Sequence, residues 1–269
     1  MLTLVCTIAL GIVTALALYF GNVAGYGWSS FFGVVAFIAG NTIAGMRIQK
    51  YVKQAMAEVQ GILAEGQRRI QAKVARWQMR PPGSMQEAQL EIARDTKVFV
   101  ADALAATEKL HRFDLWVPLM KRQIATAQFN LHWMVKDFAA VDKLMPKILC
   151  VDPAMSAMKI ARMYMTGASS EEIGKVYRKA VRRLRYNQNE LLAAVYSWIL
   201  VQRNEIDAAF KVLVHALEKS DSPVLKANRE QLANNRPVHF TNTALGDAWY
   251  ALHLETPRMH HQRQHMQWR

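Results

Sequence analysis

The stretch that decides the fold is residues 1–46, MLTLVCTIALGIVTALALYFGNVAGYGWSSFFGVVAFIAGNTIAGM, which contain no Asp, Glu, Lys or Arg. Two apolar runs of 19 residues, Leu2–Phe20 and Trp28–Met46, are joined by the uncharged loop Gly21–Gly27. A helix of that length rises about 28 Å, close to the ~30 Å hydrocarbon thickness of a bilayer. The sequence therefore predicts a transmembrane helical hairpin over residues 1–46.

Small residues recur four apart in both runs, and this spacing predicts that the two helices pack together. Small side chains let helix backbones approach closely, which matters because lipid gives apolar side chains little preference for a neighbouring helix. The alternative is that such residues are simply common in membrane helices. The amide of Asn41 is expected to hydrogen-bond across the hairpin. The predicted packing residues are Gly11, Ala15, Ala36, Gly40 and Ala44.

Basic residues follow the second run directly, at Arg47, Lys50 and Lys53, whereas the loop Gly21–Gly27 has none. The positive-inside rule then places both ends of the hairpin in the cytoplasm, in an integral protein of the inner membrane. A cleaved signal peptide is the competing interpretation. It is disfavoured because the N-terminus lacks a basic region and a second apolar run follows at once.

The whole chain carries 34 basic and 21 acidic residues, for a formal net charge of +13. This balance favours anionic partners: lipid headgroups, nucleic acid or acidic proteins. The two cysteines, Cys6 and Cys150, form no disulfide framework or CxxC metal site. We expect no cofactor, no metal site and no catalytic residues. The motifs GxSxG, HExxH, GxGxxG and the P-loop are all missing from the sequence, so we do not expect an enzyme.

Residues 47–83 are predicted to be a basic amphipathic juxtamembrane helix, Ile48–Met79, followed by a linker. Eight basic and two acidic residues lie between Arg47 and Arg80, on a helix with a nearly heptad apolar stripe. Three roles remain open: contact with anionic headgroups at about 1 kcal/mol per basic residue, self-association into a homo-oligomer as a short coiled coil, or packing back on the body of the chain. The prolines of Arg80–Ser84 end this helix.

Residues 84–256 are predicted to be an all-α domain of short helices with polar breaks between them. The expected helices are roughly Met85–Leu110, Val117–Val135, Phe138–Leu149, Pro153–Thr166, Ser170–Leu184, Asn189–Gln202, Glu205–Glu218, Pro223–Asn234 and Thr243–Leu254. Short amphipathic helices cannot bury their faces alone and must stack.

One pair of these helices resembles a tetratricopeptide repeat (TPR). Asn204–Ala209 followed by Ala216–Glu218 is similar to the turn and second helix of that repeat, and Tyr196–Ser197 with Leu200 suits its first helix. Matching positions recur at Ile148, Ala180 and Ala216, which are 32 and 36 residues apart, near the 34-residue family period. The resemblance covers roughly Val117–Leu254 and implies a curved stack of antiparallel helix pairs that holds a protein partner.

Two stretches are candidate binding sites. A basic stripe with Tyr177 and Tyr186 interleaved could hold an acidic peptide or a phosphate backbone; the favoured alternative is a solvated outer face. The loop before the last helix is dense in aromatic and hydrogen-bonding side chains, and here we favour a cap that seals the array. The candidate residues are Lys175, Arg178, Lys179, Arg182, Arg183 and Arg185 in the stripe, and Arg236, His239, Phe240, Asn242, Trp249 and Tyr250 in the loop.

Residues 257–269 form a basic tail with His260, His261 and His265. His261 and His265 are four apart and could share a metal ion if the tail were helical, but no carboxylate or cysteine accompanies them, so we favour a disordered tail. Taken together, the sequence predicts a membrane-anchored helical-repeat scaffold or adaptor that binds a protein partner at the cytoplasmic face. The alternative is a membrane-tethered module that binds anions, such as nucleic acid, a ribosome or anionic lipid.

Overall fold

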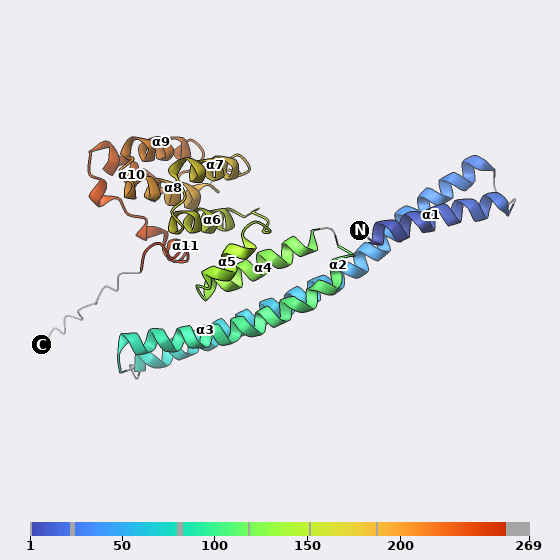
Figure 1. Cartoon of the computed structure of the whole chain (residues 1–269), viewed down its shortest axis with the longest axis horizontal. Coiled ribbons are helices and arrows are strands. Elements are labelled where there is room, and N and C mark those ends of the chain that lie inside the picture. Colours follow the sequence, from blue (N-terminus) through green and yellow to red (C-terminus); the bar gives the residue numbers. More distant parts are fainter. Residues whose placement is uncertain are drawn as a thin grey trace, which may run out of the picture. The chain divides into compact units, whose positions relative to one another are not determined.

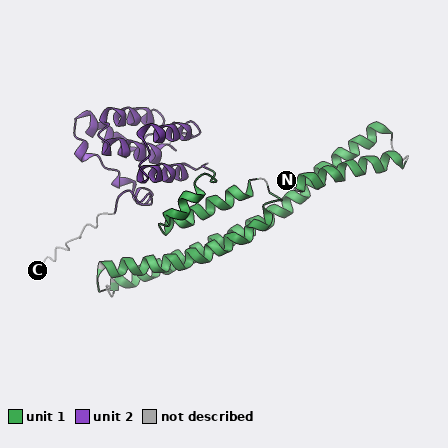
Figure 2. Cartoon of the chain, in the orientation of Figure 1, with its two compact units in different colours: residues 1–149 green, residues 150–269 purple. Residues whose placement is uncertain are grey.

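The computed structural model describes residues 2–21, 25–79, 83–117, 119–150, 152–186 and 188–256. Every regular element within these ranges is a helix (Figure 1), which confirms the predicted all-α class. The chain divides into two compact units, Met1–Leu149 and Cys150–Arg269 (Figure 2). The basic tail and the residues Arg80, Pro81 and Pro82 of the predicted helix break lie outside the described residues.

The first unit is built around one long helix, α2 (Tyr26–Met79), against which α1 (Leu2–Phe20) packs at its apolar end. The sequence predicts two helices here, Trp28–Met46 and Ile48–Met79, but they are one uninterrupted helix. No proline lies between them, and the single Gly45 weakens a helix by only about 1 kcal/mol. At 1.5 Å per residue, the 54 residues of α2 extend about 80 Å.

Helix α3 (Met85–Glu108) runs back along the charged half of α2 (Figure 1). Its first turn is capped by Ser84, whose Oγ accepts from the backbone N–H of Glu87 at 3.1 Å. The buried seam between the helices is apolar, and it is completed by α4 (Met120–Met134). Its buried members are Val59, Phe99, Val100, Ala103, Ala106 and Leu131.

The rest of the first unit returns toward the apolar end of α2. A 3-10 helix, η1 (Lys109–Phe113), follows α3, and α5 (Phe138–Leu144) follows α4. Met120 and Ile124 of α4 are buried with Ala55 of α2 and Leu110 of η1. Helix α5 ends five residues before the predicted Leu149.

The second unit surrounds α8 (Glu190–Gln202), an apolar helix whose residues from Leu192 to Leu200 are all buried. Its neighbours are α6 (Pro153–Met165), α7 (Ser170–Val181), α9 (Ile206–Leu217) and α10 (Pro223–Ala233). Side-chain caps begin three of them: Asp152 for α6, Ser169 for α7 and Ser222 for α10. Asp and Ser are preferred N-cap residues, so these three helix starts follow from local sequence.

The predicted helix Thr243–Leu254 is broken in the structure. A 3-10 turn, η3 (Thr243–Leu245), is followed by Gly246 and then by one helical turn, α11 (Asp247–Tyr250). Gly246 has φ +59° and ψ −134°, a conformation that L side chains rarely adopt and that ends the helical path. A second 3-10 turn, η2 (Pro237–His239), precedes this segment.

Two glycines of α2 differ in the space that a side chain would find beside them. A Cβ at Gly66 would lie 2.4 Å from Cγ of Phe99, whereas a Cβ at Gly61 would meet nothing within 4 Å. Alanine gains roughly 0.5–1 kcal/mol over glycine in a helix, and overpacking a core costs about 1–3 kcal/mol. We therefore expect Gly61→Ala to stabilise the helix pair and Gly66→Ala to destabilise it.

Native-state hydrogen exchange of the α3 amides in the purified full chain measures both effects locally. The opening free energy should rise in Gly61→Ala and fall in Gly66→Ala. A rise of equal size in both variants would show that α3 does not approach α2 as closely as described.

Candidate functional site

The closest contact between α1 and α2 is a glycine seam. A Cβ at Gly33 would lie 2.8 Å from Cβ of Ala15 and 2.8 Å from the carbonyl oxygen of Gly11. Further along the seam, a Cβ at Gly40 would meet Cδ2 of Leu10 at 3.0 Å and Cγ2 of Thr7 at 3.6 Å. The two backbones therefore approach as closely as small residues allow, which is how helices associate where apolar burial provides little drive.

The seam includes the predicted Gly11, Ala15 and Gly40, but its register on α2 differs from the expected one. Ser29 and Gly33 are buried in it, while Ala36 and Ala44 are only half-buried. The signal that could have found Gly33 is its four-residue spacing from Ser29, the same spacing used on α1. Asn41 is exposed, because its side chain lies about 100° around α2 from Gly40 and so faces away from the seam. The hydrogen bond that we expect across the hairpin from its amide is not found among the described residues.

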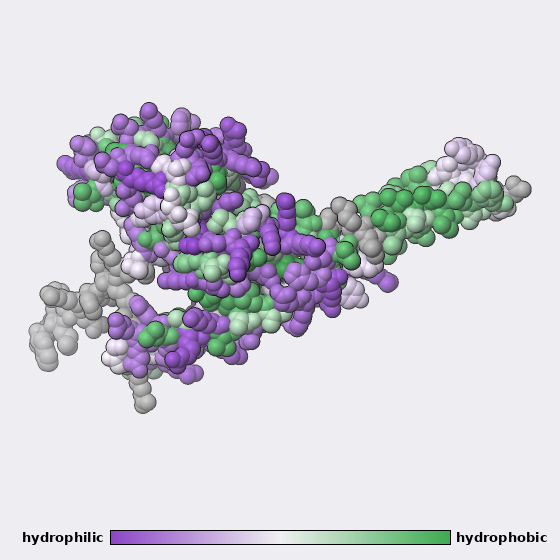
Figure 3. Space-filling view, in the orientation of Figure 1, coloured by the Kyte–Doolittle hydropathy of each residue, from purple (hydrophilic) through white to green (hydrophobic). Residues whose placement is uncertain are grey.

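The outer surface of this hairpin is apolar. Exposed large side chains include Ile12 (54%) and Phe20 (78%) on α1, and Phe31 (56%) and Ile38 (56%) on α2. On the face that Figure 3 shows, hydrophobic colour predominates along the shaft of the hairpin, and hydrophilic colour predominates over the remainder of the protein. By length and composition, α1 and the apolar half of α2 are each sufficient to cross a membrane.

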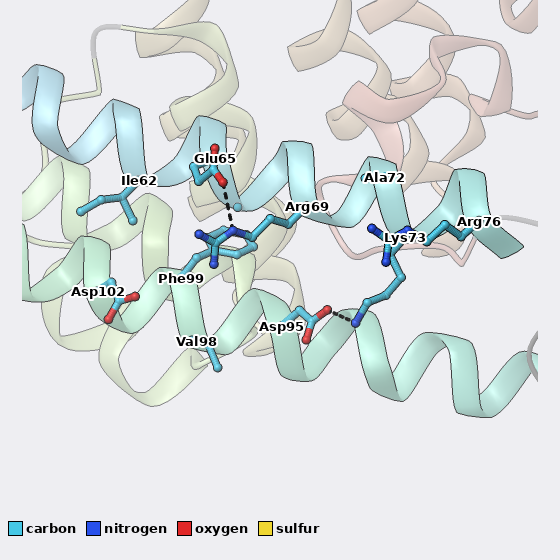
Figure 4. Close-up of a pocket in the computed structure, with 11 residues that line it drawn as sticks. Ile62, Glu65, Arg69, Ala72, Lys73, Arg76, Asp95, Val98, Phe99 and Asp102 are labelled. Atoms are coloured by element: carbon cyan, nitrogen blue, oxygen red, sulfur yellow. Dashed lines mark hydrogen bonds and ion pairs between the residues drawn. The ribbon is translucent and has the colours of Figure 1, made fainter.

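A groove of about 530 Å³ lies between α2 and α3 farther along the unit (Figure 4). Its floor includes Phe99 and Ile62, and its walls carry equal numbers of opposite charges. Those charges come from Glu65, Asp95, Asp102, Arg69, Lys73 and Arg76. A balanced groove of this kind has no net attraction for a phosphate or a metal ion, so we assign it no ligand.

Lys73 links the two walls of the groove. Its Nζ donates to Oε1 of Glu91 at 2.8 Å and also to Oδ2 of Asp95 (Figure 4). The hydrogen bond to Asp95, followed by the one to Glu91, raises the pKa of Lys73 above its ordinary value of 10.5. The pKa of Lys73 is higher in the folded state than in the unfolded state. The ion pairs of Lys73 therefore stabilise the fold fully below the unfolded-state pKa, and this stabilisation is lost as the pH rises through the folded-state pKa.

The predicted basic stripe lies on α7 and the turn that follows it. Lys175, Arg178 and Lys179 are exposed on the helix, and Arg182, Arg183 and Arg185 are exposed beyond its last residue. Nζ of Lys175 forms an ion pair with Oε1 of Glu171 at 2.9 Å. The end of α7 is thus a cluster of positive charge at the negative end of a helix, where cations are favoured.

The two tyrosines of this stripe have different environments. Tyr186 is 65% exposed, but Tyr177 is buried and stacks on Tyr196 with ring centroids 4.6 Å apart. Burial raises the pKa of Tyr177 to about 12. Tyr177 therefore belongs to the core, and only Tyr186 is accessible beside the arginines.

The predicted binding loop contributes mainly to the core of the second unit. Asn242 is fully buried: its Nδ2 donates to the carbonyl oxygen of Ala194 at 3.0 Å, and its Oδ1 accepts from Nδ2 of Asn228 at 2.8 Å. Trp249 is also buried, and its indole N–H donates to Glu255 at 2.8 Å. Arg236 and His239 are exposed, and Phe240 and Tyr250 are half-buried.

Among the described residues, no group of three or more His, Cys, Asp or Glu side chains could hold a metal ion. Cys6 and Cys150 are both free thiols. Comparisons with protein-family models, curated proteins and solved structures find no match to this chain.

The glycine seam can be tested by adding a side chain to it. Gly33→Leu should separate α1 from α2, whereas Gly45→Leu should not, since a Cβ at Gly45 meets nothing within 4 Å. A disulfide between Thr7→Cys and Gly40→Cys, in a Cys6→Ser, Cys150→Ser background, reports the separation. We expect several-fold less cross-linking with Gly33→Leu; equal cross-linking in both variants would contradict this register.

The buried Asn242 gives a second test. Asn242→Ala removes a donor to the carbonyl oxygen of Ala194 in α8 and leaves the buried Nδ2 of Asn228 without its acceptor, a loss that costs about 1–3 kcal/mol. The exposed Asn234→Ala is the control, with an expected change near zero. Hydrogen exchange of the α8 amides measures both, and an unchanged α8 in Asn242→Ala would show that the loop does not seal the unit.

Proposed function

We propose that this protein is a membrane-anchored helical scaffold that binds a protein partner at the cytoplasmic face of the membrane. The observation that carries the proposal is the continuity of α2, which passes from an apolar, lipid-compatible half into a charged, water-compatible half without a break. An anchor and a stalk in one helix tether the rest of the chain to the bilayer.

The orientation rests on charge. Arg47, Lys50 and Lys53 are all exposed directly after the apolar half of α2. Basic residues beside a membrane span are retained in the cytoplasm, so the proposal places the residues after Met46 there.

The scaffold role rests on the second unit. The pairs α6–α7 and α8–α9, with the contact between α6 and α8, support the likeness to tetratricopeptide repeats, although the match in sequence is strong only at residues 191–218. The exposed basic cluster after α7 is the surface we assign to the partner, and an acidic protein segment suits it by charge.

A pull-down from detergent-solubilised membranes tests this assignment. The matched variants are Arg182→Glu with Arg185→Glu on the proposed surface and Lys211→Glu on α9 with Lys219→Glu just after it, which change the charge equally at exposed positions. A protein that survives a high-salt wash and is lost only in the arginine variant supports the scaffold. Equal retention in both variants would exclude this surface.

The alternative is an anion-binding module, and the observation that favours it is the exposure of all six basic side chains of the stripe. Binding through phosphate contacts must weaken steeply with salt. Recovery of bulk nucleic acid or lipid at low salt, with no protein left after the high-salt wash, would favour this alternative.

A further inference from the structure

A short segment of the first unit exposes large apolar side chains where no function has yet been assigned. Between η1 and α4, Leu115 is 65% exposed, Trp116 39% and Leu119 57%. We call these three residues the apolar collar. Isolated exposed leucines are ordinary, but three large apolar side chains within five residues form a patch that needs an explanation.

The backbone of the collar is fixed. The N–H groups of Trp116 and Val117 both donate to the carbonyl oxygen of Phe113 at 3.0 Å. Phe113 and Val117 pack on the buried cluster that includes Leu110 and Met120, so these two residues point inward while the collar points outward.

Leu119 confirms that this geometry is held in place. Its φ is +66°, which is uncommon for any residue except glycine. Its carbonyl oxygen nevertheless accepts from the N–H groups of Arg122 and Gln123 at 2.9 and 3.0 Å, so Leu119 is the N-cap residue of α4. The protein therefore maintains an unfavourable backbone conformation at a leucine whose side chain is exposed.

The collar lies beside the end of the apolar hairpin. Oγ1 of Thr3, at the start of α1, donates to the carbonyl oxygen of Trp116 at 3.1 Å. The cluster beneath the collar includes Val52 and Ala55 of α2. Val52 is about 8 Å along the helix from Arg47, which matches the depth of the headgroup layer on one side of a bilayer.

The charges around the collar are mainly positive. The acidic side chains nearby are engaged, since Glu58 pairs with Lys109 at 2.7 Å and Asp114 contacts Nδ1 of His111 at 3.0 Å. A rim of cations around an aromatic and aliphatic centre is the composition of an interfacial membrane anchor. Arg112, Lys121 and Arg122 are exposed within three residues of the collar, and Arg47, Lys50 and Lys53 are exposed on α2 directly after its apolar half.

We propose that the apolar collar inserts into the headgroup and acyl boundary of an anionic bilayer, as a second membrane contact beside the hairpin. The cations bind lipid phosphates, while Leu115, Trp116 and Leu119 enter the apolar boundary. This inference rests on the proposed function in one respect, that α1 and the first half of α2 span the bilayer. The consequence is that α4 is fixed to the membrane surface at its N-terminus.

Spin labels on single cysteines measure the insertion. In a Cys6→Ser, Cys150→Ser background, the full chain is reconstituted in vesicles of phosphatidylcholine and phosphatidylglycerol with a label at Leu115→Cys. Leu90→Cys is the matched control, because Leu90 is also an exposed leucine (69%). It lies far from the membrane end of α2: its neighbour Glu91 pairs with Lys73, which is about 39 Å along α2 from Arg47. Ile12→Cys reports the lipid exposure of α1.

Collisions with oxygen, which concentrates in lipid, are compared with collisions with a water-soluble nickel chelate. We expect the oxygen-to-nickel ratio at position 115 to exceed that at position 90 several-fold and to approach that at position 12. A label at Trp116→Cys should give the same result, which guards against a local effect of one substitution.

The labels at positions 115 and 12 separate the ways in which the proposal fails. An aqueous ratio at position 115 with a lipid ratio at position 12 overturns the collar alone. Aqueous ratios at both positions overturn the collar and the membrane-spanning hairpin together. Spectral broadening at position 115 that disappears on dilution with unlabelled protein shows that a second copy covers the patch, which also overturns the insertion.

Discussion

The first unit depends on the continuity of α2. Its apolar half packs against α1 and its charged half against α3, so one helix forms two hairpins with different chemistry. In both hairpins a glycine of α2 sets the closest approach: Gly33 lets the backbone of α1 come near, and Gly66 makes room for the ring of Phe99. A break in α2 would uncouple the two hairpins.

The two hairpins are stabilised in different ways. Between α2 and α3, a buried apolar seam is flanked by charges that water can solvate. Lys73 bridges the two helices, and Lys109, directly after α3, pairs with Glu58 of α2. Between α1 and α2, the outer surface is more apolar than the seam itself, so burial cannot drive the pairing in lipid and close backbone packing must do so. This contrast within one helix is the strongest physical argument for a boundary between lipid and water near Arg47.

Much of the fold could be predicted from the sequence. The helix starts at Ser84, Asp152, Ser169 and Ser222 follow from capping chemistry that needs only local residues. The helix ends were less predictable: α5 and α7 stop before Leu149 and Leu184, because termini without a strong stop signal depend on tertiary packing.

The candidate site was less accessible to sequence reasoning. Small residues fall on several faces of α2, so the sequence could not select Gly33 over Ala36 without the position of α1. Asn242 and Trp249 are of types common in binding loops, but their partners, Ala194 and Glu255, show that they are structural. Leu115 and Leu119 carry no signal in the sequence for a place beside the hairpin, and the contact between Thr3 and Trp116 in the structure puts their segment there.

The central claim is that the hairpin spans the membrane with the remainder of the chain in the cytoplasm, and cysteine accessibility tests it most directly. Tyr26 is 80% exposed at the loop end of the hairpin, and Val238 is 92% exposed in the second unit. In a Cys6→Ser, Cys150→Ser background, a membrane-impermeant maleimide should label Tyr26→Cys in intact cells and Val238→Cys only after lysis. Labelling of Val238→Cys in intact cells, with Tyr26→Cys protected, would contradict the account.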